Sequence, residues 1–305
     1  MLPAAALPHD VLARICSFLP PGDAIFLVPR LDKALAAAAA PRVADLRAEL
    51  AAAQEAMIDE GWLGFGVDQF SIPLWALEPA WAQLTARQQM RGAARAAFHG
   101  DLAALGWTLP RLDDSATLYC EAAAAGGQLE ALRCARALGC AWGEDTCSFA
   151  AGGGHLAVLQ WARAQEPPCP WDEKTCSEAA GSGHLAVLQW ARAQEPPCPW
   201  DKGTCSWAAR GGHLAVLQWA RAQEPPCPWD EKTCSFAAIG GHLAVLQWAR
   251  AQQPPCPWDE GTCSTAVEFG RIAVLQWARA QEPPCPWDEK TCREAARRGY
   301  LAALQ

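Results

Sequence analysis

The feature that most constrains the fold is a unit of 29 residues that repeats along the second half of the chain. One complete unit runs from Pro170 to Cys198 and reads PWDEKTCSEAAGSGHLAVLQWARAQEPPC. The residues that recur at this step are Cys147, Cys176, Cys205, Cys234, Cys263 and Cys292, with two series of tryptophans, Trp161 to Trp277 and Trp171 to Trp287. Near-identical units at one spacing predict a stacked array, in which each unit buries its apolar faces against its neighbours.

Each unit predicts two short helices and a loop. Thr175 stands where an N-cap belongs, and Glu178 three residues later completes a capping box. The first helix is expected to end at residues 181–183, because glycine commonly follows a helix. The second helix, LAVLQWAR, follows His184 and is expected to stop before Pro196. Its apolar residues cover more than one stripe, so it needs neighbours on two sides. The fixed period disfavours the alternative, a compact globular helical protein.

Composition limits the partners and the compartment. The 305 residues carry a net charge of −8, and this acidic balance predicts no nucleic-acid partner. No apolar stretch approaches the roughly 18 residues of a transmembrane helix, so we expect no membrane partner either. The 15 cysteines, with no secretory signal, favour reduced thiols in the cytoplasm or the nucleus. We expect a monomer.

The repeat resembles the ankyrin repeat. The residues that match the core of the family's motif are Thr175, Ala179, Ala180, Gly183, His184, Val187, Leu188 and Ala191. The period is shorter than the family's roughly 33 residues, and Pro-Pro-Cys-Pro-Trp replaces the family's usual connection. The resemblance implies an all-α, ankyrin-like solenoid over residues 94–305, most regular from residue 140, which binds protein partners.

The N-terminus has a different character and resembles an F-box. The matching apolar positions are Leu7, Pro8, Leu12, Ile15, Phe18, Leu19 and Val28. In that family the motif docks onto the Skp adaptor of cullin-RING ubiquitin ligases, which implies that these residues bind the adaptor. The expected organisation is an F-box-like segment at 1–40, a helical bridging or capping segment at 41–93 and the solenoid at 94–305. Two alternatives remain: a helical hairpin that only caps the array, and a scaffold without a ubiquitin role.

No motif for catalysis, a cofactor or a metal stands out. Cys169, Cys176 and His184 lack the paired spacing of structural zinc sites, so the cysteines are interpreted as small apolar fillers. The histidines that follow the glycines are expected to satisfy loop backbone groups, and Arg271 takes the same position in a later unit. We therefore predict a protein that is not an enzyme.

Comparison of the units with one another predicts where a partner binds. Packing positions hardly change, whereas two positions of the first helix vary. They give the predicted partner-binding residues Phe149, Glu178, Trp207, Phe236, Thr265 and Glu294 at the first position, and Arg210, Ile239, Glu268 and Arg297 at the second. Aromatic residues and arginine are enriched at protein interfaces. Trp171 and its equivalents lie at a contact position of the family, but their invariance favours a structural plug.

Overall fold

The computed structural model describes residues 74, 77–78, 81–112 and 116–300. Within these residues every regular element is a helix, which confirms the all-α prediction. The first elements are η3 (Trp81–Gln83), α5 (Ala86–His99), α6 (Leu102–Thr108), η4 (Leu109–Arg111), α7 (Leu118–Ala125) and α8 (Leu129–Ala137). The predicted adaptor-binding residues, from Leu7 to Val28, lie outside the described residues.

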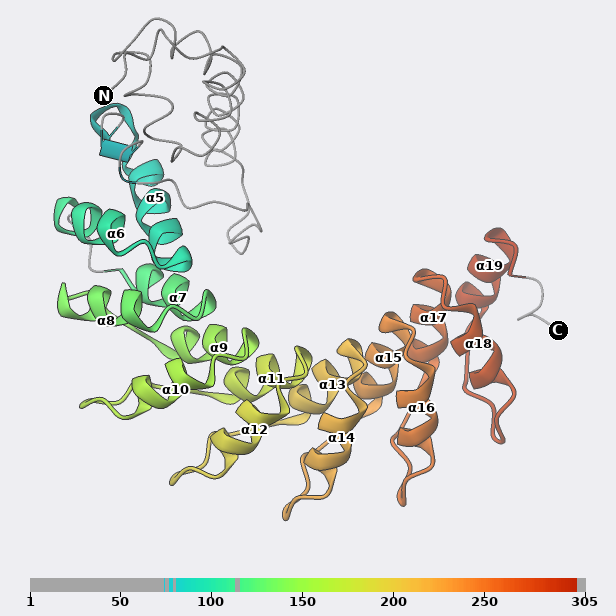
Figure 1. Cartoon of the computed structure of the whole chain (residues 1–305). Helices are drawn as coiled ribbons and strands as arrows, with labels where there is room; N and C mark the ends of the chain where they lie inside the picture. The colour runs from blue at the N-terminus through green and yellow to red at the C-terminus, as the bar shows by residue number, and fades with distance from the viewer. Residues whose placement is uncertain (1–73, 75–76, 79–80, 113–115, 301–305) are drawn as a thin grey trace, which may run out of the picture. The chain divides into compact units, whose positions relative to one another are not determined.

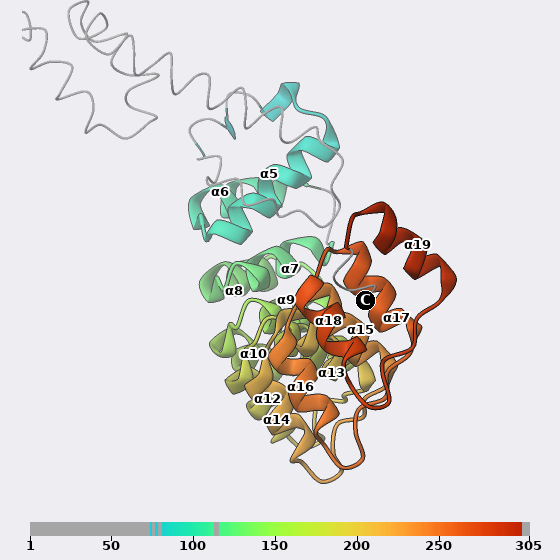
Figure 2. The same cartoon turned by 90° about the vertical axis from the view of Figure 1, so that its right-hand side faces the viewer.

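Pairs of helices then follow one another at the predicted spacing. The first helices are α9 (Glu144–Gly152), α11 (Glu173–Gly181), α13 (Lys202–Gly211), α15 (Glu231–Gly240), α17 (Glu260–Glu268) and α19 (Glu289–Arg297). The second helices are α10 (Leu156–Arg163), α12 (Leu185–Arg192), α14 (Leu214–Arg221), α16 (Leu243–Arg250) and α18 (Ile272–Arg279). Figures 1 and 2 show the first helices in one row and the second helices in another. The prediction of a helical-repeat solenoid is confirmed, while membership of the ankyrin family stays a prediction.

The chain divides into two compact units. One comprises Met1–Ala123 with Glu130–Cys140, and the other comprises Ala124–Leu129 with Ala141–Gln305. The regular repeats therefore lie together in the second unit. The domain boundaries expected from the sequence, at residues 40 and 93, stay predictions.

Small buried side chains allow the first helices to pack directly on one another. Ala179 and Ala180 of α11 are both fully buried, and the second helix contributes the buried Val187 and Leu188. Alanine brings two helix backbones close together, whereas leucine fills the larger space between the two helices of a unit. The same four positions are buried in the other complete units, so one packing scheme repeats along the array.

The start of the first helix differs from the prediction. Asp172, not Thr175, is the N-cap of α11, and its carboxylate accepts a hydrogen bond from the backbone N–H of Lys174 at 3.1 Å. A carboxylate suits this place because the helix dipole is positive there. Thr175 instead lies buried inside the helix, so Glu178 forms no capping box with it. The end of the helix, at Gly181, agrees with the prediction.

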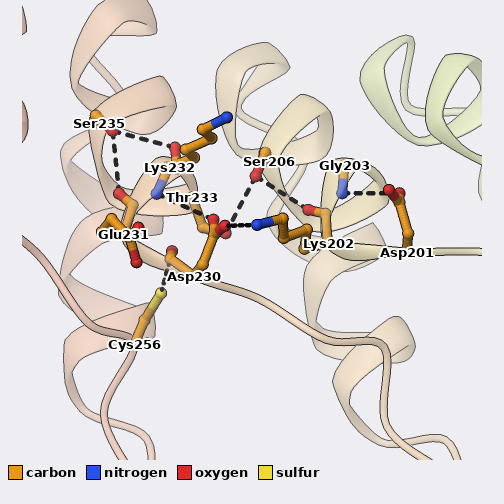
Figure 3. A network of polar contacts seen from close by, with 10 residues as sticks. All are labelled: Asp201, Lys202, Gly203, Ser206, Asp230, Glu231, Lys232, Thr233, Ser235 and Cys256. Carbon is orange, nitrogen blue, oxygen red and sulfur yellow. Dashed lines mark hydrogen bonds and ion pairs between the residues drawn. The ribbon is translucent and has the colours of Figure 1, made fainter.

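Polar contacts join the N-terminal ends of neighbouring first helices. Figure 3 shows Lys202 of α13 reaching Asp230, the N-cap of α15, with an N–O distance of 2.8 Å. This contact raises the pKa of Lys202 above its usual value. Beside it, the hydroxyl oxygens of Ser206 and Thr233 lie 3.4 Å apart. The buried threonine row thus packs between the helices, and beside it the exposed Lys202 reaches the largely buried carboxylate of Asp230.

A glycine and a histidine interlock successive units at the turn between the two helices. Gly212 has φ +77°, and a β-carbon on it would lie 2.5 Å from Nδ1 of His242 in the next unit. Nε2 of His242 lies 3.0 Å from the backbone oxygen of Arg210. In the following unit Arg271 replaces the histidine, and its Nε donates to the oxygen of Ile239 at 3.0 Å. The expected role of these side chains, satisfying backbone groups, is confirmed.

Candidate partner-binding face

All ten predicted partner-binding residues lie on the first helices of the regular repeats, from α9 to α19. The first varying position lies in the middle of each helix, and the second lies at or near its C-terminal end. We call the solvent-facing side of this row the first-helix face. Exposed residues on it are Glu178, Trp207, Arg210, Glu268 and Arg297, and half-buried residues are Phe149, Phe236, Ile239, Thr265 and Glu294. The structure thus places the ten residues along one row of helices, and their role in binding stays a prediction.

Three of these residues form one aromatic cluster across α13 and α15. The rings of Trp207 and Phe236 meet edge to face, with their centroids 5.6 Å apart. The guanidinium carbon of Arg210 lies 5.0 Å from the centroid of Trp207 and 5.9 Å from that of Phe236. Such cation–π contacts hold a charged group against apolar surface. Trp207 nevertheless keeps 41% of its surface exposed, so the cluster offers an aromatic surface to a partner.

Glycines on the preceding helix make room for these side chains. A β-carbon on Gly181 of α11 would lie 3.2 Å from the β-carbon of Trp207. One on Gly152 of α9 would lie 3.5 Å from the side chain of Glu178. Burial there raises the pKa of Glu178 above its usual value. Gly181 therefore allows Trp207 to pack closely against α11, whereas a β-carbon at Gly152 would make an ordinary contact with Glu178.

At the C-terminal end of the array, charged residues replace the aromatic cluster. Glu294 of α19 pairs with Arg297 at 2.8 Å and also accepts a hydrogen bond from Arg298. These two guanidinium groups lower the pKa of Glu294 to about 2. Glu294 and Arg297, predicted as two separate contact residues, are thus one ion-paired group.

The residues predicted from the sequence do not include three exposed residues that follow the first helices. Phe269 is 47% exposed directly after α17, and Arg271 and Arg298 lie nearby in the turns. Arg298 donates from Nη1 to the backbone oxygen of Glu268 at 3.0 Å. Phe269 and Arg298 share a position that is glycine or serine in the four preceding units. This third varying position carried the missing signal.

The loop tryptophans pack against the second helices, which agrees with the structural role that their invariance favours. The guanidinium carbon of Arg192, on α12, lies 4.1 Å from the ring centroid of Trp200. Trp200 also contacts Trp219 of α14, and the two ring centroids lie 5.9 Å apart. Trp200 therefore lies between the second helices of two successive units. The same arrangement recurs with Trp171, Trp229 and Trp258.

Two cysteines of each complete unit lie close together, and the cysteines of the described residues form no disulfide. Cys176 of α11 is fully buried, and its thiol donates to the backbone oxygen of Cys198 at 3.9 Å. The thiol of Cys198 donates to the backbone oxygen of Asp172 at 3.4 Å. A hydrogen bond with Cys176, together with burial, raises the pKa of Cys198. In the described part of the chain, no group of three or more histidine, cysteine or acidic side chains is placed to hold a metal ion.

Iodoacetamide is expected to distinguish these thiols. Cys134 is partly exposed, whereas Cys176 and Cys198 are fully buried and react only after local opening. Alkylation of the buried pair in the folded chain should be slower than that of Cys134 on the order of 100-fold. Mass spectrometry of digests taken over time measures both rates. Equal rates in the absence of denaturant would contradict the buried positions of the pair.

No described helix is both long enough and apolar enough to cross a membrane.

Comparisons with known proteins give little further guidance. No protein-family model and no curated protein matches the chain. Among solved structures, the pentatricopeptide repeat protein PPR10 from maize is 17% identical, with a TM-score of 0.35, over 94% of this chain and 45% of that chain. PPR10 in complex with an 18-nt psaJ RNA element is 15% identical, with a TM-score of 0.30, over 94% of this chain and 49% of that chain. The chain thus spans about half the length of these structures, and similarity at this level assigns neither a family nor an activity.

One expectation from the sequence is corrected by these findings. The acidic charge of the chain predicts no nucleic-acid partner, yet the similar structures include the helical-repeat protein PPR10 in complex with RNA. Net charge describes the whole chain, whereas binding depends on the charge of one face. The exclusion of nucleic acid is therefore withdrawn.

Proposed function

We propose that the chain is a binding protein without chemistry of its own, which serves as the substrate-recognition subunit of a cullin-RING ubiquitin ligase. The F-box-like segment recruits the Skp adaptor, and the first-helix face holds a protein substrate. The observation that carries the binding role is the cluster of Trp207, Phe236 and Arg210. It leaves an aromatic surface exposed in an array whose alanine, valine and leucine packing positions are buried in every complete unit. Interfaces concentrate binding energy in aromatic and arginine side chains of this kind.

The ligase role is supported by the apolar positions of the N-terminal motif. Leu12, Ile15 and Leu19 follow one another at helical spacing, and this spacing predicts one apolar face suited to a helix-binding partner. The adaptor and the substrate are then bound by different parts of the chain. Loss of one partner should leave the other bound.

Leu12→Asp is expected to weaken capture of the Skp adaptor by about 30-fold or more, because it places a charge in an apolar contact. Affinity capture with the intact chain, followed by quantification of the adaptor, measures the effect. The matched control is Trp207→Ala, which should release substrate proteins and retain the adaptor. If the intact chain captures no Skp adaptor, or if Leu12→Asp retains it fully, the ligase role is wrong.

A scaffold without a ubiquitin role is the second candidate. It is favoured by Pro29 and Asp32, which depart from the family's pattern near the end of the motif. In this case the intact chain captures partners through Trp207 but never the adaptor. The same capture experiment therefore separates the two candidates.

A further inference from the structure

We propose that the C-terminal half of the first-helix face binds a protein segment in which a bulky apolar side chain stands next to acidic side chains. This inference rests on the proposed function only in assigning substrate binding to the repeats. The surface concerned, which we call the docking strip, comprises Trp207, Arg210, Phe236, Phe269, Arg271 and Arg297.

The apolar part of the docking strip provides the first argument. In the compact unit that contains the regular repeats, the large hydrophobic side chains that are exposed among the described residues are Trp207 and Phe269, at 41% and 47%. The two lie on the same row of helices, at α13 and just after α17. Between them Phe236 contacts Trp207 through its ring. Exposed aromatic side chains on one row of helices mark a place where a partner's apolar side chain is buried.

The arginines provide the second argument. In the part of the chain that the structure describes, no carboxylate forms an ion pair with Arg210 or Arg271. Arg210 lies against the two aromatic rings, and Nε of Arg271 donates to the backbone oxygen of Ile239. These contacts hold both guanidinium groups at the surface without neutralising their charge. Preorganised guanidinium groups bind carboxylates well, because the planar donors match the two carboxylate oxygens.

The charge around the docking strip indicates the sign of the charge on the partner. Four arginines lie at the C-terminal ends of α13 to α19 or in the adjoining turns: Arg210, Arg271, Arg297 and Arg298. Only Glu268 and Glu294 lie among them, and Glu294 pairs with both Arg297 and Arg298. The remaining positive charge complements acidic side chains on a partner.

The N-terminal ends of the same helices carry negative charge, which favours a short peptide segment over a nucleic acid as the partner. There the starts of α15 and α17 carry four acidic residues, Asp230, Glu231, Asp259 and Glu260, against the single Lys232. A polyphosphate strand that followed the face would meet these carboxylates, whereas a peptide that contacts only the arginine-bearing ends would not. The docking strip therefore fits a peptide with local acidic charge better than a uniformly charged polymer.

Selection from a phage-displayed library of random linear peptides tests the proposal on the intact chain. Enriched peptides should carry Trp, Phe or Leu next to Asp or Glu. Selection on the Arg271→Glu, Arg297→Glu double variant should shift enrichment from acidic to basic side chains. Fluorescence anisotropy of a labelled selected peptide should show a loss of about 10-fold or more with Trp207→Ala. Gln218→Ala, at an exposed position of the second helix α14 and outside the first-helix face, is the control and should bind as the parent does.

Several outcomes would overturn the proposal. They are an absence of enriched peptides, enrichment without acidic residues, and equal binding by the Trp207→Ala variant. If 18-nt oligouridine bound more tightly than the selected peptide and displaced it, and if Trp207→Ala weakened this binding, the strip would be a nucleic-acid site. Self-association in sedimentation that Trp207→Ala abolishes would assign it to a second copy of the chain. Capture of the Skp adaptor uses the N-terminal segment, so failure here and failure of the ligase role are separate results.

Discussion

Gly212→Ala is expected to lower the free energy of unfolding by about 2–5 kcal/mol. Two costs add at this residue. Its φ of +77° is left-handed, which costs an alanine about 1–2 kcal/mol. The new β-carbon would also lie 2.5 Å from Nδ1 of His242, and overpacking of this kind costs about 1–3 kcal/mol. Urea unfolding monitored by circular dichroism measures the change.

Gly139→Ala separates the two costs. Gly139 has φ +89°, but nothing lies within 4 Å of the position of its β-carbon. This variant should therefore lose only the roughly 1–2 kcal/mol of the backbone conformation. Combining Gly212→Ala with His242→Ala should restore part of the loss, because the ring that the β-carbon meets is gone. Equal losses for Gly212→Ala and Gly139→Ala would show that the units do not interlock at this turn.

Trp229→Ala is expected to cost about 2–3 kcal/mol of stability, somewhat less than the 3–5 kcal/mol of a fully buried tryptophan. Trp229 lies between Arg221, 4.2 Å from its centroid, and Trp248, at 5.9 Å. Removing the ring opens a cavity between α14 and α16 and breaks both contacts. Urea unfolding of the variant measures the loss.

Trp207→Ala is the informative comparison, because it removes the same side chain from an exposed position. It should cost about 1 kcal/mol or less, since exposed substitutions rarely destabilise strongly. The effects on partner binding should be in the reverse order. Trp207→Ala should lose the partner, whereas the folded Trp229→Ala variant should still bind it. If Trp207→Ala destabilised the chain as much as Trp229→Ala, the division into structural and binding tryptophans would be wrong.

The repeat made the fold predictable from the sequence. Because each unit contacts mainly its neighbours, the spacing of Gly183, His184 and the LAVLQWAR segment determines most of the local structure. The N-cap was predicted three residues too late, at Thr175 instead of Asp172. Both residue types are common N-caps, and the sequence does not show that the threonine is needed inside the helix as a buried packing residue.

The candidate site was predictable only in part. Variation between units identified Trp207, Arg210 and Phe236, but not that the three side chains form one cluster. Side chains from different units meet only after stacking, and the register of that stacking depends on contacts such as Gly181 with Trp207. Phe269 lies at a third varying position, which is glycine or serine in the four preceding units. The exclusion of nucleic acid went wrong because net charge does not describe a single face.

Deletion of one complete unit tests the stacked-repeat account most directly. Removing residues 170–198 joins Cys169 to Pro199, so the remaining units keep their sequence and their spacing. This chain should unfold cooperatively in urea and keep the parent's mean residue ellipticity at 222 nm, because every remaining unit still has its neighbours. Removing only residues 184–198 takes away α12 and should destabilise the chain far more. If the 29-residue deletion unfolds the protein, or if the shorter deletion is equally well tolerated, the units do not stack as described.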